Sequence, residues 1–448
     1  MRIAHIVPHL GGGVGRVLLA WISRAHAHTN EQHVVVCLEH VGEETMARAR
    51  MLGISVVDNQ YGALSALNEV VHNADITTVH WWNHPLLYDT IVNGELPPCR
   101  MAIWSHVAGH TPPHVFTKNL ITYPDFFVVA TPYSLEAPIV AAMNARQRTE
   151  KLRLVFTCAG IDHVADAKPL AHEGFVVGYI GTVDYCKLHR QFLSMCAVVD
   201  QPDIRFVVVG GPNHEEIRRE SSAMGLDDKI TFAGQVAGIV PYLSSFDIFG
   251  YPLAPGHYGT GEQALIEAMA AGLPTVVFSH GAERCLVDHE RTGLIVNSEG
   301  AYAQAIMRLR DDAGLRTFLG KNAAQEARER FSLDTLVDGW HNIFLELSPK
   351  EKRLHTWAGQ RGIRGAQLYV ESLGESIGCF RQSLCPDIFE NQKHADRAIA
   401  KLQGPFCSET RGSPFHYHRY FPNDHLLAHW CSILRTAPCT QHPSRKSI

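Results

Sequence analysis

Short apolar runs alternate with amphipathic stretches along this chain, and the alternation begins again near residue 174. Runs such as 3–7 and 175–180 have the length of buried strands, while the segments between them space their apolar residues as helices do. Strands and helices that alternate in this way predict a parallel sheet with helices on both faces. The sequence therefore predicts an α/β protein with two doubly wound domains joined near residues 165–173. Because ligands of such sheets bind beyond the carboxyl ends of the strands, we expect a cleft where the two domains face each other.

The first domain is assigned to residues 1–170 and the second to residues 171–348. The first is expected to contain strands at 3–7, 34–38, 55–57, 76–80, 101–104, 126–130 and 152–156, with helices at 16–26, 43–52 and 132–143. The second is expected to contain strands at 175–180, 204–209, 229–232, 247–251, 275–278 and 293–296. Its helices are expected at 188–199, 214–224, 236–244, 299–311, 313–329 and 333–347, with a further short helix after residue 260.

Residues 349–448 depart from this alternation and form a C-terminal extension of unassigned role. Helices are expected within 366–384, 391–402 and 426–434, a strand or loop at 416–418, and a frayed end from Thr436. Two interpretations of the extension are open. It is either an element packed on the second domain, or a membrane-surface or oligomerisation element, as the basic and aromatic residues around Arg419 suggest.

Composition narrows the functional classes. A formal net charge of −5 gives no basic field for nucleic acid, and no apolar run approaches the ~20 residues of a membrane span. Eleven cysteines without a CxxC pair indicate reduced thiols in a cytoplasmic protein, although peripheral association with the inner face of the membrane remains open. The 27 histidines include no HExxH motif, and the helical pair His425 and His429 has no third ligand nearby in sequence, so no metal site is expected.

A glycine-rich loop that enters a short helix, residues 258–274, is the main candidate for a ligand site. Thr260 is expected to be the N-cap residue, and Gln263 would complete a capping box with it. Gly272 fits the position just past the helix end, and Pro274 prevents the helix from continuing.

The same loop has features that suit a phosphorylated ligand. Gly259 and Gly261 would let a ligand approach the backbone closely, and the free N–H groups of the first helical turn favour an anion. Glu267, just inside the helix, would be within reach of hydroxyl groups on that ligand. An anion next to a carboxylate-bound polyol is the chemistry of a nucleotide sugar. The competing interpretation is an ordinary, well-capped loop between strand and helix.

Other candidates also follow predicted strands. Gly12 and Gly13 lie in a glycine loop after the first strand, and Gly211 repeats that arrangement in the second domain. Lys187 lies just past the first strand of the second domain, where it could neutralise a departing diphosphate. His106 follows a strand of the first domain and suits a sugar hydroxyl. The alternatives are tight turns for the glycines, a solvated lysine, and a buried histidine with satisfied nitrogens.

Several of these segments together resemble the retaining GT-B glycosyltransferases of the glycogen-synthase-like superfamily, over residues 1–348. The resemblance rests on the N-terminal glycine loop and on residues 178–187, 207–212, 231–236, 267–274 and 290–296. It implies two facing Rossmann-like domains, a nucleotide-sugar donor held mainly by the second, and an acceptor bound by the first. It also implies retention of anomeric configuration and no metal or other cofactor. Base contacts are expected near Gly234.

The resemblance also implies roles for single residues. Glu267 matches the family glutamate that binds the donor ribose, and Lys187 matches the lysine that contacts the donor diphosphate. His106 is similar to the histidine beside the donor sugar. Gly12 and Gly13 match the loop near the diphosphate and the acceptor.

Two departures from the family pattern concern the catalytic electrostatics. The family often has a second glutamate eight positions before Glu267, where this chain has Gly259. Glu262 is nearby, and we predict that its side chain reaches the sugar from the first helical turn. Thr182, counted among the donor-binding residues, stands where the family often has an arginine. Arg190 or the N-terminus of the helix after residue 260 is expected to compensate.

The sequence thus predicts a retaining, metal-independent, hexosyl-type glycosyltransferase. Its donor would be a nucleoside-diphosphate sugar, and its acceptor a glycan or lipid-linked glycan in surface polysaccharide synthesis. His106, Lys187 and Glu262 are the predicted catalytic residues. Two alternatives remain open: a non-catalytic GT-B protein that binds a nucleotide sugar or a partner, and a nucleotide-sugar epimerase on the same fold.

Overall fold

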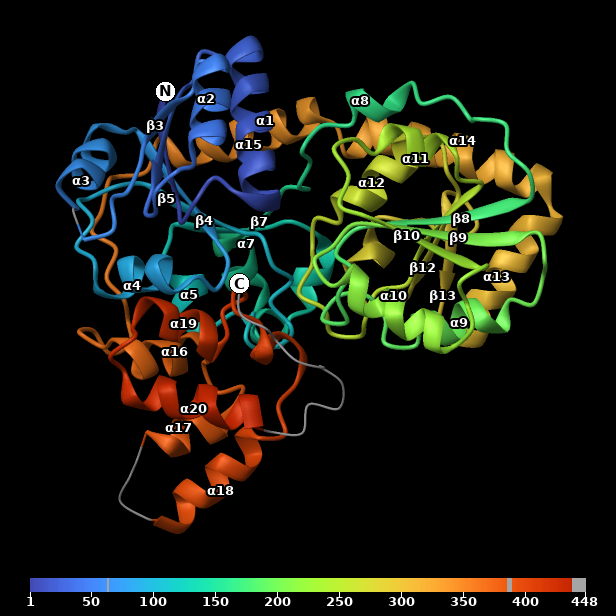
Figure 1. The fold of residues 1–448 in the computed structure, drawn as a ribbon. Coiled ribbons are helices and arrows are strands. Elements are labelled where there is room, and N and C mark those ends of the chain that lie inside the picture. Colours follow the sequence, from blue (N-terminus) through green and yellow to red (C-terminus); the bar gives the residue numbers. More distant parts are fainter. Residues whose placement is uncertain (63, 385–388, 437–448) are drawn as a thin grey trace.

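Two α/β domains lie side by side in the computed structural model, and a helical extension packs against the first of them (Figure 1). The structure describes residues 1–448 except 63, 385–388 and 437–448. Each domain has one parallel sheet, and the described residues give seven strands to the first sheet and six to the second. The predicted α/β class with two doubly wound domains is confirmed. Among the described residues, no helix has both the length and the apolar character needed to cross a bilayer.

The sheet of the N-terminal domain has the strand order β3-β2-β1-β4-β5-β6-β7. Its strands are β1 (Arg2–Val7), β2 (Gln32–Cys37), β3 (Ser55–Val57), β4 (Ile76–Trp81), β5 (Met101–Ser105), β6 (Phe126–Val129) and β7 (Leu152–Leu154). The strand order reverses between β1 and β4. Such a reversal opens a crevice beyond the carboxyl ends of the two strands, where ligands of α/β sheets bind.

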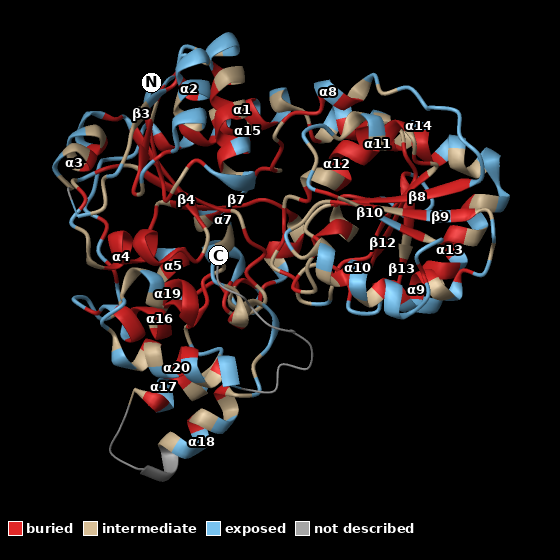
Figure 2. Cartoon of the chain, viewed as in Figure 1, coloured by how far each residue is buried: buried red, intermediate tan, exposed pale blue. Residues whose placement is uncertain are grey.

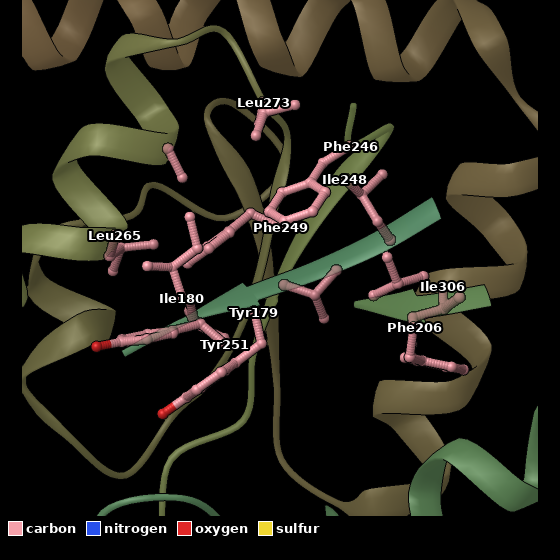
Figure 3. Packing of buried hydrophobic residues seen from close by; sticks show 14 of the residues in the cluster. Tyr179, Ile180, Phe206, Phe246, Ile248, Phe249, Tyr251, Leu265, Leu273 and Ile306 are labelled. Atoms are coloured by element: carbon pink, nitrogen blue, oxygen red, sulfur yellow. The ribbon is translucent and has the colours of Figure 1, made fainter. Parts of the chain in front are cut away.

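The sheet of the C-terminal domain repeats this plan with the order β10-β9-β8-β11-β12-β13, so its reversal lies between β8 and β11. Its strands are β8 (Phe175–Ile180), β9 (Ile204–Val209), β10 (Ile230–Gly234), β11 (Ile248–Tyr251), β12 (Thr275–Phe278) and β13 (Gly293–Val296). Buried aromatic and aliphatic side chains pack between this sheet and its helices. Figure 3 shows Tyr179 of β8 and Tyr251 of β11 side by side in that core.

Helices cover both faces of each sheet (Figure 1). Those of the N-terminal half are α1 (Gly12–His28), α2 (Glu43–Met51), α3 (Leu64–Asn73), α4 (Pro85–Asn93), α5 (Lys118–Thr122), α6 (Pro138–Ala141), α7 (Ala145–Lys151) and α8 (Asp162–Ala165). Those that follow are α9 (Phe192–Val198), α10 (His214–Ala223), α11 (Val240–Ser244), α12 (Gln263–Ala270), α13 (Glu299–Asp311), α14 (Ala313–Arg330) and α15 (Leu333–Leu347). The sequence did not predict α3, α4, α5, α7 or α8, and in α4 almost all residues are buried, so no exposed polar face marks it as a helix.

Three predicted boundaries are wrong for identifiable reasons. The predicted loop around Gly12 is already helical, and a Cβ on Gly15 would lie 1.8 Å from the Leu10 carbonyl oxygen, so glycine lets the first turn of α1 pack on the preceding residues. The expected helix 132–143 is interrupted before Pro138, whose ring nitrogen cannot donate a helical hydrogen bond. The helix expected at 188–199 starts only at Phe192, and the segment before it is instead joined to the loop after β11, where the N–H of His189 donates to the carbonyl of Pro252.

The last helix of the C-terminal half returns to the N-terminal domain. α15 packs along α1, and the ring of Trp340 stacks on that of Trp21 with centroids 4.9 Å apart. Arg24 of α1 forms hydrogen bonds of 2.7 Å with both carboxylate oxygens of Asp334. The chain therefore crosses between the domains near the end of β7 and again before α15.

The C-terminal extension packs on the N-terminal domain, which corrects the expectation that it decorates the second domain. Its helices are α16 (Gly365–Leu373), α17 (Gly378–Ser383), α18 (Phe389–Ile399), α19 (Pro414–Tyr420) and α20 (His425–Thr436). α16 and α19 lie against α4 and bury their facing sides there (Figure 2). Residues 416–418 are helical rather than a strand or loop, because Ser413 caps α19 and Pro414 occupies its first turn. The frayed end expected after Thr436 lies outside the described residues.

Candidate active site

A cavity of about 690 Å³ lies between the two domains, beyond the carboxyl ends of β1, β8, β9 and β10. The N-terminal domain lines it with Leu10, Gly11, Gly12, Gly13, Arg16, Leu19, Thr45 and Arg48. The C-terminal domain lines it with Ile180, Gly181, Thr182, Val209, Gly210, Gly211, Gln235, Val236 and Ile239. Four residues predicted to bind the donor, Gly12, Gly13, Thr182 and Gly211, thus face one cavity. Gly234, a fifth, directly precedes the lining residue Gln235.

On the side of the C-terminal domain, a glycine lets two turns that line the cavity pack closely together. Gly210 has a φ of +129°, and a Cβ there would lie 1.9 Å from the carbonyl oxygen of Gly181. The turns after β8 and β9 can therefore approach each other only if residue 210 is glycine. Their backbones then form the floor of the cavity, where N–H groups could face an anionic ligand.

Arg16 of the N-terminal domain contacts Glu267, the predicted ribose-binding residue of the C-terminal domain. Its Nη2 lies 3.1 Å from Oε1 of Glu267, which is otherwise almost completely buried. Gln263 Nε2 also donates to that oxygen at 3.2 Å, and His163 Nε2 lies 3.4 Å from it. Glu267 is therefore joined to the cavity through Arg16, which lines it. Sequence reasoning missed Arg16, although it is the first basic residue after the glycine loop.

Lys187 and Glu262, two of the predicted catalytic residues, form a buried ion pair. Lys187 Nζ lies 2.9 Å from Glu262 Oε2, and the hydroxyl of Tyr251 donates to the same oxygen at 2.6 Å. Burial acts to raise the pKa of Glu262, but the charges of Lys187 and His257 outweigh it and lower that pKa. Burial likewise opposes the charge of Lys187, and Glu262 raises the lysine pKa. Both groups are therefore ionised, and neither lines the cavity.

The space beside Gly259 explains why this position is glycine. A Cβ there would lie only 2.0 Å from Oε1 of Glu262 and 3.1 Å from Nδ1 of His257. The carboxylate of Glu262 thus occupies the space that a side chain at position 259 would enter. The glutamate that the family often has at this place and the glutamate of this chain compete for one location.

A second buried acid–base pair adjoins the first. Nε2 of His257 lies 3.0 Å from Oε2 of Glu283, and its Nδ1 lies 3.9 Å from Oε1 of Glu262. Although burial acts to lower it, the pKa of His257 is raised by Glu283 and Glu262. Oε1 of Glu262 and Oε1 of Glu283 are buried without a hydrogen-bond partner among the described residues. The loop of Glu283 is expected to face the cleft from its place after a strand, but no sequence feature links Glu283 to His257, 26 residues away.

The loop before α12 joins the two domains, and the predicted capping box is wrong. Glu262, with a φ of +29°, is the N-cap residue of α12, and its side chain makes no capping bond. Thr260 instead shares a hydrogen bond of 3.1 Å with Thr131 of the N-terminal domain. A Cβ on Gly261 would lie 3.0 Å from the side chain of Thr157, so this glycine also permits the close approach of the domains.

The side chain of Gln263 completes this joint between the domains. It accepts a hydrogen bond of 2.8 Å from the Ala159 N–H and donates one of 3.0 Å to the Gly160 carbonyl. The helix end predicted at the other side of α12 is confirmed, because α12 stops at Ala270 and Gly272 has a φ of +80°. Thr260, Gly261 and Gln263 thus place α12 and Glu267 relative to the N-terminal domain.

His106, the third predicted catalytic residue, follows β5 and is only partly buried. Its Nε2 lies 3.0 Å from Nδ1 of His80, and burial lowers its pKa to about 3. Two residues further on, the N–H of Ala108 donates to the carbonyl of Tyr258 at 3.0 Å. His106 therefore lies where the N-terminal domain meets the loop before α12, although it does not line the cavity.

The C-terminal extension supplies a cation to this region. Arg411 lies over the ring of Tyr258 at 5.1 Å, and its Nη1 lies 3.9 Å from Oδ2 of Asp184. It also donates to the thiol of Cys186. Arg190, expected to compensate for Thr182, lies over the ring of Tyr185 at 4.3 Å instead. No sequence motif linked Arg411 to this site, because the extension does not continue the alternation of strands and helices from which the site was predicted.

One group of side chains among the described residues has the composition of a metal site. Donor atoms of His9, Glu39 and His84, from loops after β1, β2 and β4, all lie within 4.8 Å of one another. The hydroxyl of Tyr420 donates to Glu39, and the charge of Arg419 acts on both Glu39 and His84. A cation would have to compete with that arginine. This group is separate from the residues that line the cavity.

Known proteins resemble the chain in sequence over part of its length. Residues 174–312 match the family model described as Glycosyl transferases group 1. The lipopolysaccharide core biosynthesis glycosyltransferase LpsD of Rhizobium meliloti is 29% identical over 141 residues, which are 31% of this chain and 40% of that protein. The D-inositol 3-phosphate glycosyltransferase of Salinispora tropica is 28% identical over 193 residues, 40% of this chain and 39% of that protein. The matches thus span about 40% of these relatives.

Solved structures resemble the fold more completely. Anabaena Alr3699/HepE, determined in complex with UDP-glucose, superposes with a TM-score of 0.61 at 18% identity, over 77% of this chain and 100% of its own. Sucrose-phosphate synthase from Thermosynechococcus elongatus gives a TM-score of 0.57 at 18% identity, over 78% of this chain and 99% of its own. These likenesses establish the GT-B fold.

Proposed function

We propose that this chain, which has the GT-B fold and a group 1 glycosyltransferase domain, transfers a hexosyl-type sugar from a nucleoside-diphosphate sugar to a glycan or lipid-linked acceptor. The transfer would retain the anomeric configuration and require no metal ion or other cofactor. The observation that carries this proposal is the cavity between the domains. Glycine turns from both sheets meet there, and Arg16 connects it to the buried carboxylate of Glu267.

The diphosphate of the donor would lie against the glycine turns. Backbone N–H groups of Gly12, Gly13 and Gly211 and the hydroxyl of Thr182 would donate to it, and Arg16 would supply charge from the rim of the cavity. Negative charge grows on the diphosphate as the sugar leaves, so fixed donors lower the barrier most at this place. Glu267 would accept hydrogen bonds from the ribose once Arg16 turns toward the phosphates.

The buried pair of Lys187 and Glu262 would act at the leaving-group side of the sugar. Glu262, itself buried, holds the lysine ammonium 2.9 Å away in a largely buried site, where a fixed charge is worth more than in solvent. Glu262 takes the space beside Gly259, and we assign to it the role of the glutamate that the family often has there. His106 would contact the donor sugar from the N-terminal domain.

The relatives suggest the class of acceptor. LpsD acts in lipopolysaccharide core biosynthesis, and a further relative at 25% identity is the capsular polysaccharide biosynthesis glycosyltransferase CapM of Staphylococcus aureus. We therefore place the activity in the synthesis of a surface polysaccharide or glycolipid, in the cytoplasm or at the inner face of the membrane. The neighbour bound to UDP-glucose makes uridine donors the first to test.

A donor screen tests this proposal. The purified chain is incubated with UDP-, GDP- and ADP-sugars, with and without glycan and lipid-linked acceptors, and release of nucleoside diphosphate is measured. We expect release that depends on one donor and one acceptor, a product whose anomeric configuration by NMR matches the donor, and no loss of rate in EDTA. Glu267→Ala is expected to weaken donor binding and Lys187→Ala mainly to lower turnover. Absence of both nucleotide binding and release would refute the proposal.

A second candidate function, nucleotide-sugar binding without turnover, is favoured by one observation. Lys187 and Glu262 neutralise each other, and neither lines the cavity. Calorimetry with UDP, GDP and ADP separates the two functions when combined with the donor screen. Tight nucleotide binding without release from any donor would favour the non-catalytic protein.

A further inference from the structure

Four histidines form a continuous hydrogen-bonded chain through the N-terminal domain. They come from β2, β1 and β4 and from the loop after β5, which are consecutive in the sheet. The nitrogen–nitrogen distances are 2.8 Å from His33 Nδ1 to His5 Nε2, 3.0 Å from His5 Nδ1 to His80 Nε2 and 3.0 Å from His80 Nδ1 to His106 Nε2. The chain therefore runs across the sheet and ends at the predicted catalytic histidine.

Glu31 closes the other end of the chain. Nε2 of His33 has no hydrogen-bond partner among the described residues and faces Oε2 of Glu31 at 3.4 Å. The other carboxylate oxygen lies 2.7 Å from Nδ1 of His341 on α15, whose side chain is partly exposed. Burial acts to raise the pKa of Glu31, but the approach of His33 and the hydrogen bond with His341 outweigh it and lower that pKa. Glu31 is thus an ionised carboxylate, which can only accept hydrogen bonds.

Aromatic side chains seal the chain from water. The ring of Trp21 packs edge-on against that of His5, with centroids 5.0 Å apart, and Trp104 lies 4.6 Å from His106. Trp340 of α15 covers Trp21 from outside. The indole N–H groups of all three tryptophans have no hydrogen-bond partner among the described residues. The imidazoles in this core can therefore satisfy their nitrogens only through one another.

The ionised carboxylate that faces one end of the chain favours one direction for its hydrogen bonds. A neutral imidazole has one N–H and one lone pair, so each histidine between two partners donates to one and accepts from the other. Burial holds the pKa of His5 and His80 well below the ordinary value, which keeps both neutral. Above the ordinary histidine pKa an imidazole carries one ring proton, and in His33 that proton is favoured on Nε2, because a lone pair there would face the ionised Glu31 at 3.4 Å. Nδ1 of His33 then accepts from His5, and every later imidazole donates in the same direction. His106 then donates through Nε2 and keeps a lone pair on Nδ1.

That lone pair lies on the side of His106 away from the chain. Nδ1 of His106 has no hydrogen-bond partner among the described residues, and the side chain is only partly buried. The loop that carries it touches the loop before α12 through the Ala108–Tyr258 hydrogen bond. Nδ1 can therefore meet a ligand that is held between the domains.

We propose that Glu31, His33, His5 and His80 are positioning residues that set the tautomer of His106. They give His106 an acceptor nitrogen, which selects a hydroxyl donor on the bound sugar. The identity of the ligand rests on the proposed glycosyl transfer, whereas the histidine chain itself is seen in the structure. Apolar side chains would fill the same core without the cost of burying polar groups, so the direction of the hydrogen bonds is what the histidines add.

Histidine tautomers can be read directly by NMR. The protein is labelled with ¹⁵N-histidine, and the ring nitrogens are recorded at pH 8, above the ordinary histidine pKa of about 6.5. In the unchanged protein we expect the His106 proton on Nε2. In Glu31→Gln the amide can donate as well as accept, so the direction is no longer fixed and His106 is expected to populate both tautomers. Glu173→Gln, which neutralises an exposed carboxylate, is the matched control and should leave His106 unchanged.

A second variant covers the case that Glu31→Gln does not fold. His5→Phe keeps a ring against Trp21 but breaks the chain, and it should also release the tautomer of His106. The proposal would be overturned if His106 carried its proton on Nδ1 in the unchanged protein, or if it kept the Nε2 tautomer in both variants. In the donor assay Glu31→Gln should raise the donor KM about threefold to tenfold, the range of one hydrogen bond, with a smaller change in kcat. If the protein turns over no donor, the proposed function fails, but the NMR measurement still shows whether the histidine chain sets the tautomer of His106.

Discussion

The two domains share one architecture but keep their buried polar groups in different places. In the C-terminal domain Lys187 and Glu262 lie in loops beyond the strand ends, and their opposite charges compensate each other. In the N-terminal domain His5 and His80 lie within the strands, in the core itself, where burial keeps them neutral. The first arrangement is a pair of opposite charges. The second consists of neutral imidazoles next to one carboxylate, Glu31, and differs from the first in that only the direction of its hydrogen bonds reaches the far end.

This difference predicts that mild acid destabilises the N-terminal domain first. A buried histidine with a lowered pKa stays neutral while the unfolded chain takes up a proton, so stability is lost as the pH falls from 6.5 toward the folded pKa. The pKa of His106 is about 3 in the folded protein, so the free energy of unfolding should fall by about 1.4 kcal/mol per pH unit below 6.5. Between pH 6.5 and 5 this one residue should lower it by about 2 kcal/mol. His5 and His80 act in the same direction, so the sum should exceed the effect of any single substitution.

The His257 site of the C-terminal domain should respond in the opposite way over this interval, whereas His189 of this domain, with a pKa lowered by burial, acts as the N-terminal histidines do. The pKa of His257 is raised, so its contribution is present at low pH and is lost as the pH rises through the folded pKa. Glu262, with a lowered pKa, loses its contribution only below its ordinary pKa of 4.5. Hydrogen exchange at pH 7 and 5, corrected for intrinsic rates, should show protection falling in β1, β4 and β5 but not in β8 and β11. An equal loss of protection in both sheets would show that the two domains do not differ in their response to acid.

Glu262→Ala should have the largest effect of any single substitution in the C-terminal domain. It leaves the buried ammonium of Lys187 without its partner and removes one of the two carboxylates beside His257. Breaking a buried ion pair in this way costs about 3 to 5 kcal/mol. Urea unfolding followed by tryptophan fluorescence measures the loss. Glu173→Ala, an exposed carboxylate, is the control, and a loss no larger than in this control would show that the pair stabilises nothing.

Exchanging two residues tests whether Glu262 replaces the glutamate expected at position 259. Gly259→Glu alone should destabilise the protein, because a Cβ there would lie 2.0 Å from Oε1 of Glu262. Glu262→Gly alone removes the carboxylate but also relieves its φ of +29°. In the double variant the new carboxylate enters the vacated space from position 259. We expect a favourable coupling of about 1 to 3 kcal/mol and recovered donor turnover, whereas purely additive effects would mean that the two positions are unrelated.

The contrast also explains which parts of the molecule the sequence could predict. The six strands of the second sheet and the end of α12 followed from apolar runs and from Gly272, because these signals are local. Glycines 12, 13 and 211 could be assigned to a cavity because turns after parallel strands meet at one edge of the sheet. The histidine chain could not be predicted, because His5 and His80 read only as interruptions of apolar strands until strand order and register bring them together.

Other misses have the same origin in long-range contacts. Glu262 became the N-cap of α12 because the side chain of Thr260 is engaged by Thr131 of the other domain, a contact that local capping preference does not contain. Arg411 reaches Asp184 from an extension whose packing surface the sequence did not reveal. In both cases a residue of one domain is positioned by a partner more than 100 residues away.

Arg16 and Glu267 give the smallest expected change in stability and the clearest test of how the domains cooperate. Their ion pair joins the two domains, but the arginine side chain is 53% exposed, so Arg16→Ala should cost less than about 1 kcal/mol of unfolding free energy. If Arg16 moves onto the diphosphate when the donor binds, the same substitution should raise the donor KM about tenfold or more, as expected for a hydrogen bond to a charged group.

The matched variant Arg16→Lys separates charge from geometry, because a lysine keeps the charge but loses the planar fork. Calorimetry with the nucleoside diphosphate and with the nucleoside alone completes the test. Arg16→Ala should weaken only the diphosphate, since the arginine acts on phosphate, whereas Glu267→Ala should weaken both ligands, since the carboxylate acts on ribose. Equal losses for the nucleoside in the two variants would mean that Arg16 acts through Glu267, and that the N-terminal domain contributes position rather than charge to donor binding.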